Sequence, residues 1–99
     1  MNQIMKIGKG VEEVDGVMQA VPAYIGKCST SLSRLLDNGD VTVKAMGNRA
    51  IANTMKIIER VARMKKAVGK TVEIDVPVFV LEKVGENELA IFNITVSCK

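Results

Sequence analysis

The spacing of the apolar residues changes at Gly47, and this change constrains the fold more than any other feature of the sequence. Val41 and Val43 alternate with polar neighbours, which is the period of a β-strand. After Asn48, apolar residues recur at steps of three and four, the period of one helix face. We therefore expect a strand, a break, and a helix over residues 48–67 that buries the stripe Ile51, Met55, Ile58, Val61 and Ala62.

The last thirty residues show the period of strands throughout. Residues 85–87, Gly-Glu-Asn, provide a turn between two alternating runs, which predicts a β-hairpin. Pro77 has no N–H group to donate to a ladder, so the first strand should lie at a sheet edge or contain a bulge. The alternating apolar positions are Val72, Ile74, Val76, Val78 and Val80, then Ala90, Phe92, Ile94, Val96 and Cys98.

The first forty residues are less regular. Residues 3–7 have the pattern of a short strand. Apolar residues then follow helical spacing from residue 11 to 35, but Pro22 and two glycines interrupt that stripe. We expect a helix over residues 11–20, a kink or strand at 21–25, and a second helical segment over 29–36. The predicted order of elements is strand, helix, strand, helix, strand, strand.

Length and composition favour one domain. A chain of 99 residues with 47% hydrophobic side chains has enough apolar surface for a single core. We expect no membrane association, since no apolar run is long enough to span a bilayer and residues 1–10 lack the pattern of a secretory signal. A cytoplasmic location is expected, with Cys28 and Cys98 as reduced, packed thiols because they form no CxxC pair.

The sequence contains no histidine, and this excludes much of enzyme chemistry. Imidazole-based triads, histidine general bases and most zinc sites all require that side chain. No glycine-rich phosphate loop or dense acidic cluster suggests another catalytic centre. We therefore predict no catalytic residue, no metal, no cofactor and no small-molecule substrate, and we expect that the protein is not an enzyme.

Positive charge is concentrated in the middle of the chain. Residues 41–68 carry seven basic side chains against one acidic, a net charge of +6. Residues 1–40 carry four against five, and residues 69–99 carry three against five. A concentrated basic stretch is expected of a surface that binds phosphates, although a lysine and arginine face can also simply be solvated.

The residues around the predicted strand–helix junction resemble a known superfamily. Residues 43–51, Val-Lys-Ala-Met-Gly-Asn-Arg-Ala-Ile, resemble the second strand and glycine loop of the Alba family of chromatin proteins, with one extra residue. They also resemble, without a gap, the corresponding segment of the related stage V sporulation protein S family, and there the similarity reaches Asn53 and Lys56. Residues 74–79 and 90–91 resemble the final two strands of that sporulation family.

This resemblance covers the last 60 residues or so and implies both a fold and a function. The implied fold is a single Alba-like domain over residues 1–99, an α+β two-layer structure of order β-α-β-α-β-β, with two helices on one face of a four-stranded mixed sheet. The implied function is nucleic-acid binding (DNA or RNA) by a nucleoid-associated homodimer. By position, the binding residues would be Lys44, Asn48, Arg49, Asn53 and Lys56.

The resemblance leaves the first binding loop open, because an Ile-Gly-Lys triplet occurs at residues 7–9 and again at 25–27. Lys9 and Lys27 are therefore both candidates. The later copy matches the archaeal Alba pattern better but shortens the first helix, whereas the earlier copy leaves about ten residues too many before Val41. The C-terminal hairpin also departs from DNA-coating Alba proteins, because it carries three glutamates and one lysine, which argues against wrapping of duplex DNA.

Arg49 is the strongest individual candidate. A guanidinium beside a glycine loop at a helix start can bind a phosphate with two hydrogen bonds, although it can also pair with a neighbouring carboxylate. Asn48 has the residue type of a helix N-cap. Phosphate contact without sequence reading is the expected mechanism. The alternative is a structural or regulatory protein-binding dimer of the sporulation protein S type, with no direct nucleic-acid role.

Overall fold

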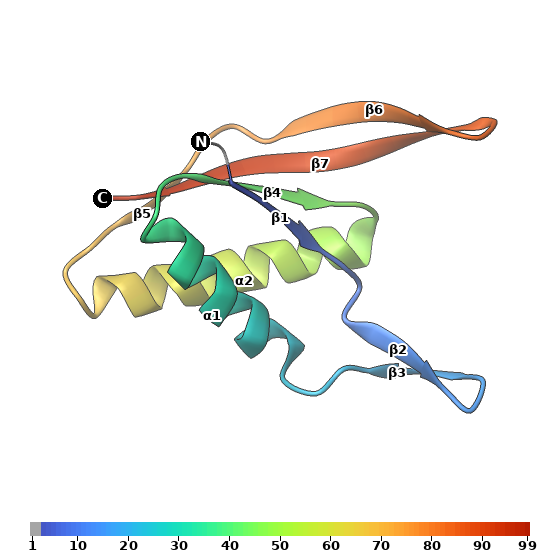
Figure 1. Cartoon of the computed structure of the whole chain (residues 1–99), viewed down its shortest axis with the longest axis horizontal. Coiled ribbons are helices and arrows are strands. Elements are labelled where there is room, and N and C mark those ends of the chain that lie inside the picture. Colours follow the sequence, from blue (N-terminus) through green and yellow to red (C-terminus); the bar gives the residue numbers. More distant parts are fainter. Residues whose placement is uncertain (1–2) are drawn as a thin grey trace.

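Two helices cover one face of a mixed β-sheet in the computed structural model, which describes residues 3–99 (Figure 1). This arrangement confirms the predicted α+β class with two layers. The elements are, in chain order, β1 Gln3–Ile7, β2 Val11–Val14, β3 Val17–Ala20, α1 Tyr24–Leu36, β4 Val41–Ala45, α2 Asn48–Lys66, β5 Val72–Ile74, β6 Val78–Val84 and β7 Asn87–Cys98.

The main sheet is built around β4 and β7. β4 pairs in parallel with β1 and antiparallel with β7, and β7 pairs on its other side with β5 and β6. The strand order is β1-β4-β7-β5, with β6 continuing the edge that β5 begins. Residues 75–77 separate β5 from β6, so the predicted edge strand is present but is broken at Pro77.

The core lies between the sheet and the helices. Along β4, Val41, Val43 and Ala45 are buried, whereas the side chains between them face the other side of the sheet. Buried residues of α1, α2 and β7 complete the same cluster: Leu32, Leu36, Ala50, Ile57, Ile58, Val61, Phe92, Ile94 and Val96, with Ile7 of β1. No helix within residues 3–99 is long and apolar enough to cross a membrane.

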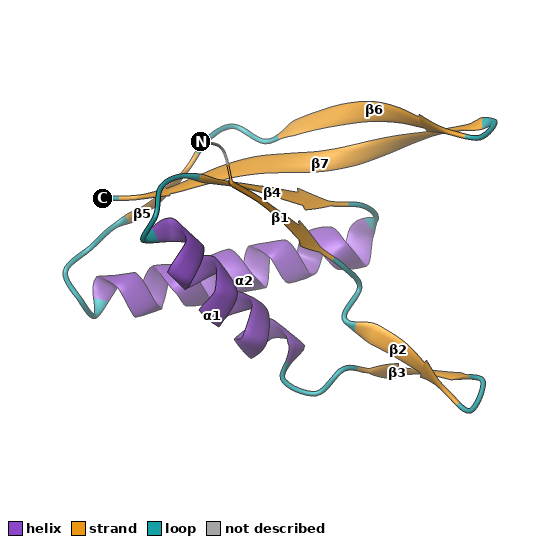
Figure 2. Ribbon diagram, viewed as in Figure 1, coloured by secondary structure: helices purple, strands orange, loops and turns teal. Residues whose placement is uncertain are grey.

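The prediction of a helix over residues 11–20 is wrong, because this segment forms an isolated β-hairpin of β2 and β3 (Figure 2). Its turn is Asp15–Gly16, and both residues have positive φ, 51° and 77°. A two-residue turn of this kind matches the twist of antiparallel strands, and Asp-Gly is among its preferred sequences. The hairpin lies between the first Ile-Gly-Lys triplet and α1, and it changes the predicted element order.

The predicted kink or strand at residues 21–25 is also wrong. α1 is one helix that starts at Tyr24, five residues before the expected start at Ser29. Pro22 lies just outside the helix, where its missing N–H group costs nothing. Gly26 is tolerated inside the helix, and a Cβ atom there would lie 3.7 Å from the Arg60 guanidinium.

The prediction for α2 is right in extent and wrong in detail. The buried face consists of Ala50, Thr54, Ile57, Ile58, Val61 and Lys65, whereas Met55, which we expected to be buried, is 43% exposed. The buried hydroxyl of Thr54 is satisfied within the helix, because it donates to the carbonyl of Ala50. Asn48 is not the N-cap: it is the first residue of the helix, and Gly47 occupies the N-cap without a side-chain hydrogen bond.

Candidate nucleic-acid interface

Both helices hold the loop that follows β1. The Gly8 N–H donates to the Tyr24 hydroxyl of α1 at 2.8 Å, and the Asn53 amide of α2 donates to the Gly8 carbonyl at 3.1 Å. We call these two hydrogen bonds the Gly8 clamp. Burial raises the pKa of Tyr24, which keeps its hydroxyl protonated, although the Gly8 N–H acts in the opposite direction. The clamp fixes the backbone directly before Lys9.

Gly10 ends this loop in close contact with Tyr24. Its φ of +70° is one that side chains rarely adopt, and a Cβ atom there would lie 2.9 Å from Cδ2 of the Tyr24 ring. The Gly10 carbonyl accepts a hydrogen bond of 2.8 Å from the N–H of Val21, which closes the base of the β2–β3 hairpin. The loop therefore needs glycine at residue 10 for conformational and steric reasons together.

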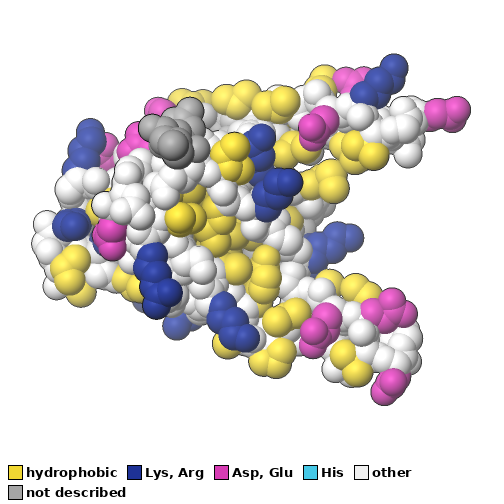
Figure 3. All heavy atoms as spheres, in the orientation of Figure 1, with side chains coloured by type: hydrophobic (Ala, Val, Ile, Leu, Met, Phe, Trp, Pro, Cys, Tyr) yellow, Lys and Arg dark blue, Asp and Glu magenta, His cyan; other side chains and the backbone are white. Residues whose placement is uncertain are grey.

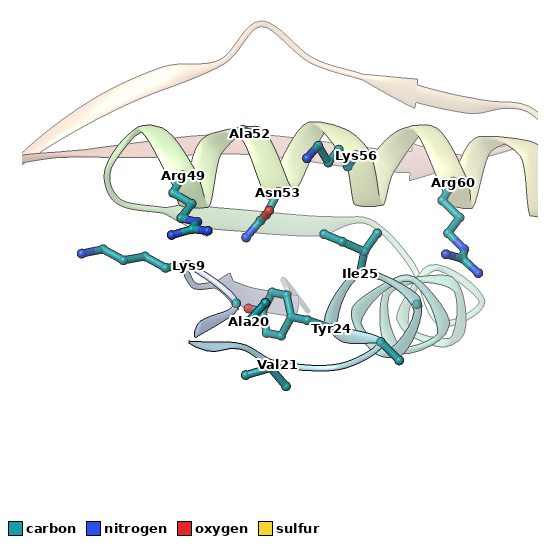
Figure 4. A pocket seen from close by; sticks show the side chains of 13 residues that line it. Lys9, Ala20, Val21, Tyr24, Ile25, Arg49, Ala52, Asn53, Lys56 and Arg60 are labelled. Atoms are coloured by element: carbon teal, nitrogen blue, oxygen red, sulfur yellow. The ribbon is translucent and has the colours of Figure 1, made fainter. Parts of the chain in front are cut away.

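A cavity of about 380 Å³ lies between this loop, the start of α1 and the first half of α2 (Figure 4). Four basic side chains line it: Lys9, Arg49, Lys56 and Arg60. Lys9 and Arg49 lie together at one end of the cavity and Arg60 at the other, with Tyr24 and Asn53 between them. Of the described residues that line it, none is acidic.

Four basic side chains of α2, Arg49, Lys56, Arg60 and Arg63, follow one face of the helix, whereas Lys65 belongs to the buried face. With the amide of Asn53 they are separated by steps of four and three residues. A second cavity shares Ile25, Lys56 and Arg60 with the first and adds Glu59 and Arg63, so the surface continues along the helix. We call the surface lined by Lys9, Arg49, Lys56 and Arg60 the basic groove.

These four cations are not neutralised by neighbouring acids. Within residues 3–99, the ion pairs join Arg63 to Glu59, Lys65 to Asp37 and Lys99 to Glu73. The Arg63–Glu59 pair is exposed, so solvent weakens it. Lys65 is buried and its charge is held by Asp37, and this contact lowers the pKa of the Asp37 carboxyl. The sequence also allowed Arg49 to pair with a neighbouring carboxylate. Among residues 3–99, Arg49 forms no such ion pair.

The structure separates the two Ile-Gly-Lys triplets. Residues 7–9 end β1 and form the clamped loop, and Lys9 lines the basic groove. Residues 25–27 lie inside α1, where Lys27 is exposed and outside the lining of the groove. Of the two predicted first-loop lysines, Lys9 is therefore the one that lies with Arg49.

The remaining predicted residues do not lie together: three are in the basic groove, one is on the far side of the sheet, and one lines no cavity. Arg49, Asn53 and Lys56 lie in the basic groove, where Asn53 uses its amide to hold Gly8. Lys44 alternates with the buried residues of β4, so it lies on the opposite face of the sheet, beside Lys6 and Glu82. Asn48 is exposed at the start of α2 and lines neither cavity.

Arg60 belongs to the groove but is absent from the residues predicted from the sequence. The sequence does contain a pattern that identifies Arg60, because this residue lies four residues after Lys56 and eleven after Arg49 on one helix face. Tyr24 was missed for a different reason: its role depends on a hydrogen bond to Gly8, sixteen residues away in sequence.

Comparison with known protein families and with curated protein sequences finds no match to this chain.

Proposed function

We propose that this protein binds nucleic acid through its phosphate backbone, with the basic groove as the contact surface and no catalytic role. One observation carries the proposal: four cationic side chains, from a clamped loop and one helix face, meet at a cavity, and among residues 3–99 no acid pairs with them or lines that cavity. Such a surface attracts polyanions, and each neutralised phosphate releases condensed counterions.

The length of the groove fits a short run of phosphates. Arg49 and Arg60 are eleven residues apart on α2, which corresponds to about 16 Å along the helix axis. A nucleic-acid strand with a phosphate every ~3.4 Å would place about four or five phosphates over this length. The two guanidinium groups can each bind a phosphate with two hydrogen bonds, and the lysines act as point charges.

The aromatic residues support contact with the backbone rather than with bases. Tyr24 holds the Gly8 clamp, and Phe92 is buried in the core. Phe79 is exposed on β6, where it packs edge-on against Phe92, with ring centroids 5.5 Å apart, and it is not part of the groove lining. Tyr24 is the one aromatic residue among the described residues that line the groove, and its hydroxyl is held by Gly8 while Gly10 lies against its ring. Contact with phosphates is therefore favoured over stacking of bases, and binding should depend little on sequence.

A salt titration with a charge-reversal variant tests this function. With three or four phosphates neutralised per protomer, the logarithm of the affinity should fall against the logarithm of salt with a slope of about −3. Arg49→Glu should abolish retention of labelled DNA and RNA at low salt. Lys27→Glu, with the same charge change outside the groove, is the matched control and should retain binding. A flat salt response, or equal loss in both variants, would contradict the proposal.

We extend the proposal to a homodimer, with β6 as the contact surface. β6 pairs only with β7 among the described strands, so its outer edge has free backbone groups. Apolar side chains are exposed on both of its faces, namely Val78, Phe79, Val80, Leu81 and Val84. An antiparallel contact between two copies of β6 would satisfy the backbone groups of the edge and place these apolar side chains beside their copies in one symmetric interface.

The same strand favours the rival function, a protein-binding dimer without a nucleic-acid role. Leu81→Glu should convert the dimer to a monomer, as measured by light scattering during size-exclusion chromatography. If the dimeric parent binds neither DNA nor RNA at low salt, the rival function replaces the proposed one. If the parent is a monomer, the homodimer proposal is wrong and the groove proposal is tested alone.

A further inference from the structure

The β2–β3 hairpin is an acidic arm beside the basic groove. It projects from the body of the molecule and pairs with no other strand in residues 3–99 (Figures 1 and 2). Glu12, Glu13 and Asp15 are its only charged residues, all of them exposed. The hairpin therefore brings negative charge to a surface that otherwise attracts phosphates.

Strand alternation places one of these acids on the side of the groove. Ala20 lines the cavity, and its cross-strand partner is Val11. Two residues further along each strand, Glu13 and Met18 form the next pair on that same side of the hairpin. Glu12 pairs with Gln19 and therefore points to the other side.

A second acidic arm extends on the same side of the molecule. β6 and β7 carry Glu82, Glu86 and Glu88 at or near their turn, against the single basic residue Lys83. In Figure 3, acidic side chains mark the tips of both arms, and a basic side chain lies in the recess between them. Glu82 lies beside Lys44 on the face of the sheet opposite the groove, so the β2–β3 arm is the acidic element beside the groove.

We propose that the basic groove accepts a single nucleic-acid strand and that the β2–β3 arm, through Glu13, excludes a duplex. This inference rests on the proposed function. A single strand presents one row of phosphates, which the groove can neutralise. A duplex carries a second row of phosphates, so that its axis bears one charge per ~1.7 Å when both strands are counted. That second row would approach Glu13 on the β2–β3 arm, and repulsion remains effective within a Debye length of about 10 Å at 0.1 M salt.

Fluorescence anisotropy with the full chain tests the inference. The probes are a 20-nucleotide single strand, as DNA and as RNA, and a 20-base-pair duplex, both in low salt. The parent should bind the single strands at least about tenfold more tightly per site, an effect of the order expected when one or two charge contacts are replaced by repulsion. Glu13→Lys should raise the duplex affinity about threefold or more while leaving single-strand affinity within about twofold.

Glu12→Lys is the matched control, since it makes the same charge change on the other side of the hairpin. It should alter the duplex affinity less than Glu13→Lys does. If the parent binds the duplex as tightly as the single strands, or if the two lysine variants have equal effects, the inference is wrong although the proposed function stands. If the parent binds none of the probes, the proposed function itself fails.

Discussion

The two projecting hairpins differ in how the rest of the protein supports them. β7 continues from its arm into the core, where Phe92, Ile94 and Val96 are buried, so the β6–β7 register is fixed by packing. In β2–β3, by contrast, Val11 is the only residue that is even partly buried, and the register depends on the Asp-Gly turn. One arm is therefore an extension of the fold, whereas the other is attached to it at its base.

The largest expected effect on the free energy of unfolding comes from the difference in packing between β7 and the β2–β3 arm. Ile94→Ala removes a side chain that is 1% exposed in the core and should lower the free energy of unfolding by about 3 kcal/mol. Val17→Ala in β3, where Val17 is 57% exposed, should change it by less than about 0.5 kcal/mol. Urea denaturation of both variants measures the difference, and similar losses would show that the β2–β3 arm is packed in solution.

A second experiment tests the attachment of the β2–β3 arm. Gly10→Ala forces an unfavourable φ and a Cβ atom 2.9 Å from the Tyr24 ring, which should cost about 2 kcal/mol. Gly16→Ala in the hairpin turn also has positive φ but no atom within 4 Å, and it should cost about 1 kcal/mol. Thermal unfolding compares the two; a larger loss at Gly16 would place the critical glycine in the turn instead of the base.

The Gly8 clamp gives a smaller effect. Tyr24→Phe removes the hydroxyl that accepts from the Gly8 N–H and should cost about 1 kcal/mol, since the N–H can then bond to water. We expect amide hydrogen exchange at Gly8 to accelerate and salt-dependent nucleic-acid binding to weaken, because Lys9 is no longer fixed. Unchanged exchange at Gly8 would mean that Asn53 alone holds the loop.

The smallest effect is expected far from both arms, at Asp37. Lys65 lowers the pKa of Asp37, with a smaller contribution from Lys70, so the pair stabilises the fold at pH above the ordinary value of 3.8. This contribution should disappear as the pH falls through the lowered pKa of the folded state. Asp37→Asn should therefore reduce the melting temperature at pH 7, and the difference from the parent should shrink as the pH falls below 3.8. If the difference in melting temperature between the parent and Asp37→Asn were the same at every pH, the Lys65–Asp37 ion pair would not be the cause of the destabilisation.

The elements that follow from the sequence are those with long, regular patterns. β4, α2 and β7 bury their apolar stripes against one another, and their positions agree with the periodicity. The segment 11–20 was mispredicted because its valines and methionine also satisfy helical spacing. The Asp15–Gly16 dipeptide is the local signal that distinguishes a hairpin from a helix here. The helical spacing continues past it to residue 35, and for this reason it favours one helical stripe over the turn.

The groove was predictable only in part, for geometric reasons. Arg49 and Lys56 share a helix face, which spacing alone reveals, and the same spacing identifies Arg60. Lys44 is close to Arg49 in sequence, but strand alternation places it on the opposite face of the sheet. Lys9 joins the groove through the Gly8 clamp, which links distant residues and leaves no periodic signal.

The two ends of the β2–β3 hairpin are joined by a hydrogen bond, in which the Val21 N–H donates to the Gly10 carbonyl with an N···O distance of 2.8 Å. Because those ends are already adjacent, the hairpin of ten residues between them can become longer or shorter, or carry side chains of opposite charge, without moving β1 relative to α1. The charge beside the basic groove can thus be changed within one surface hairpin, while the residues of the core stay the same.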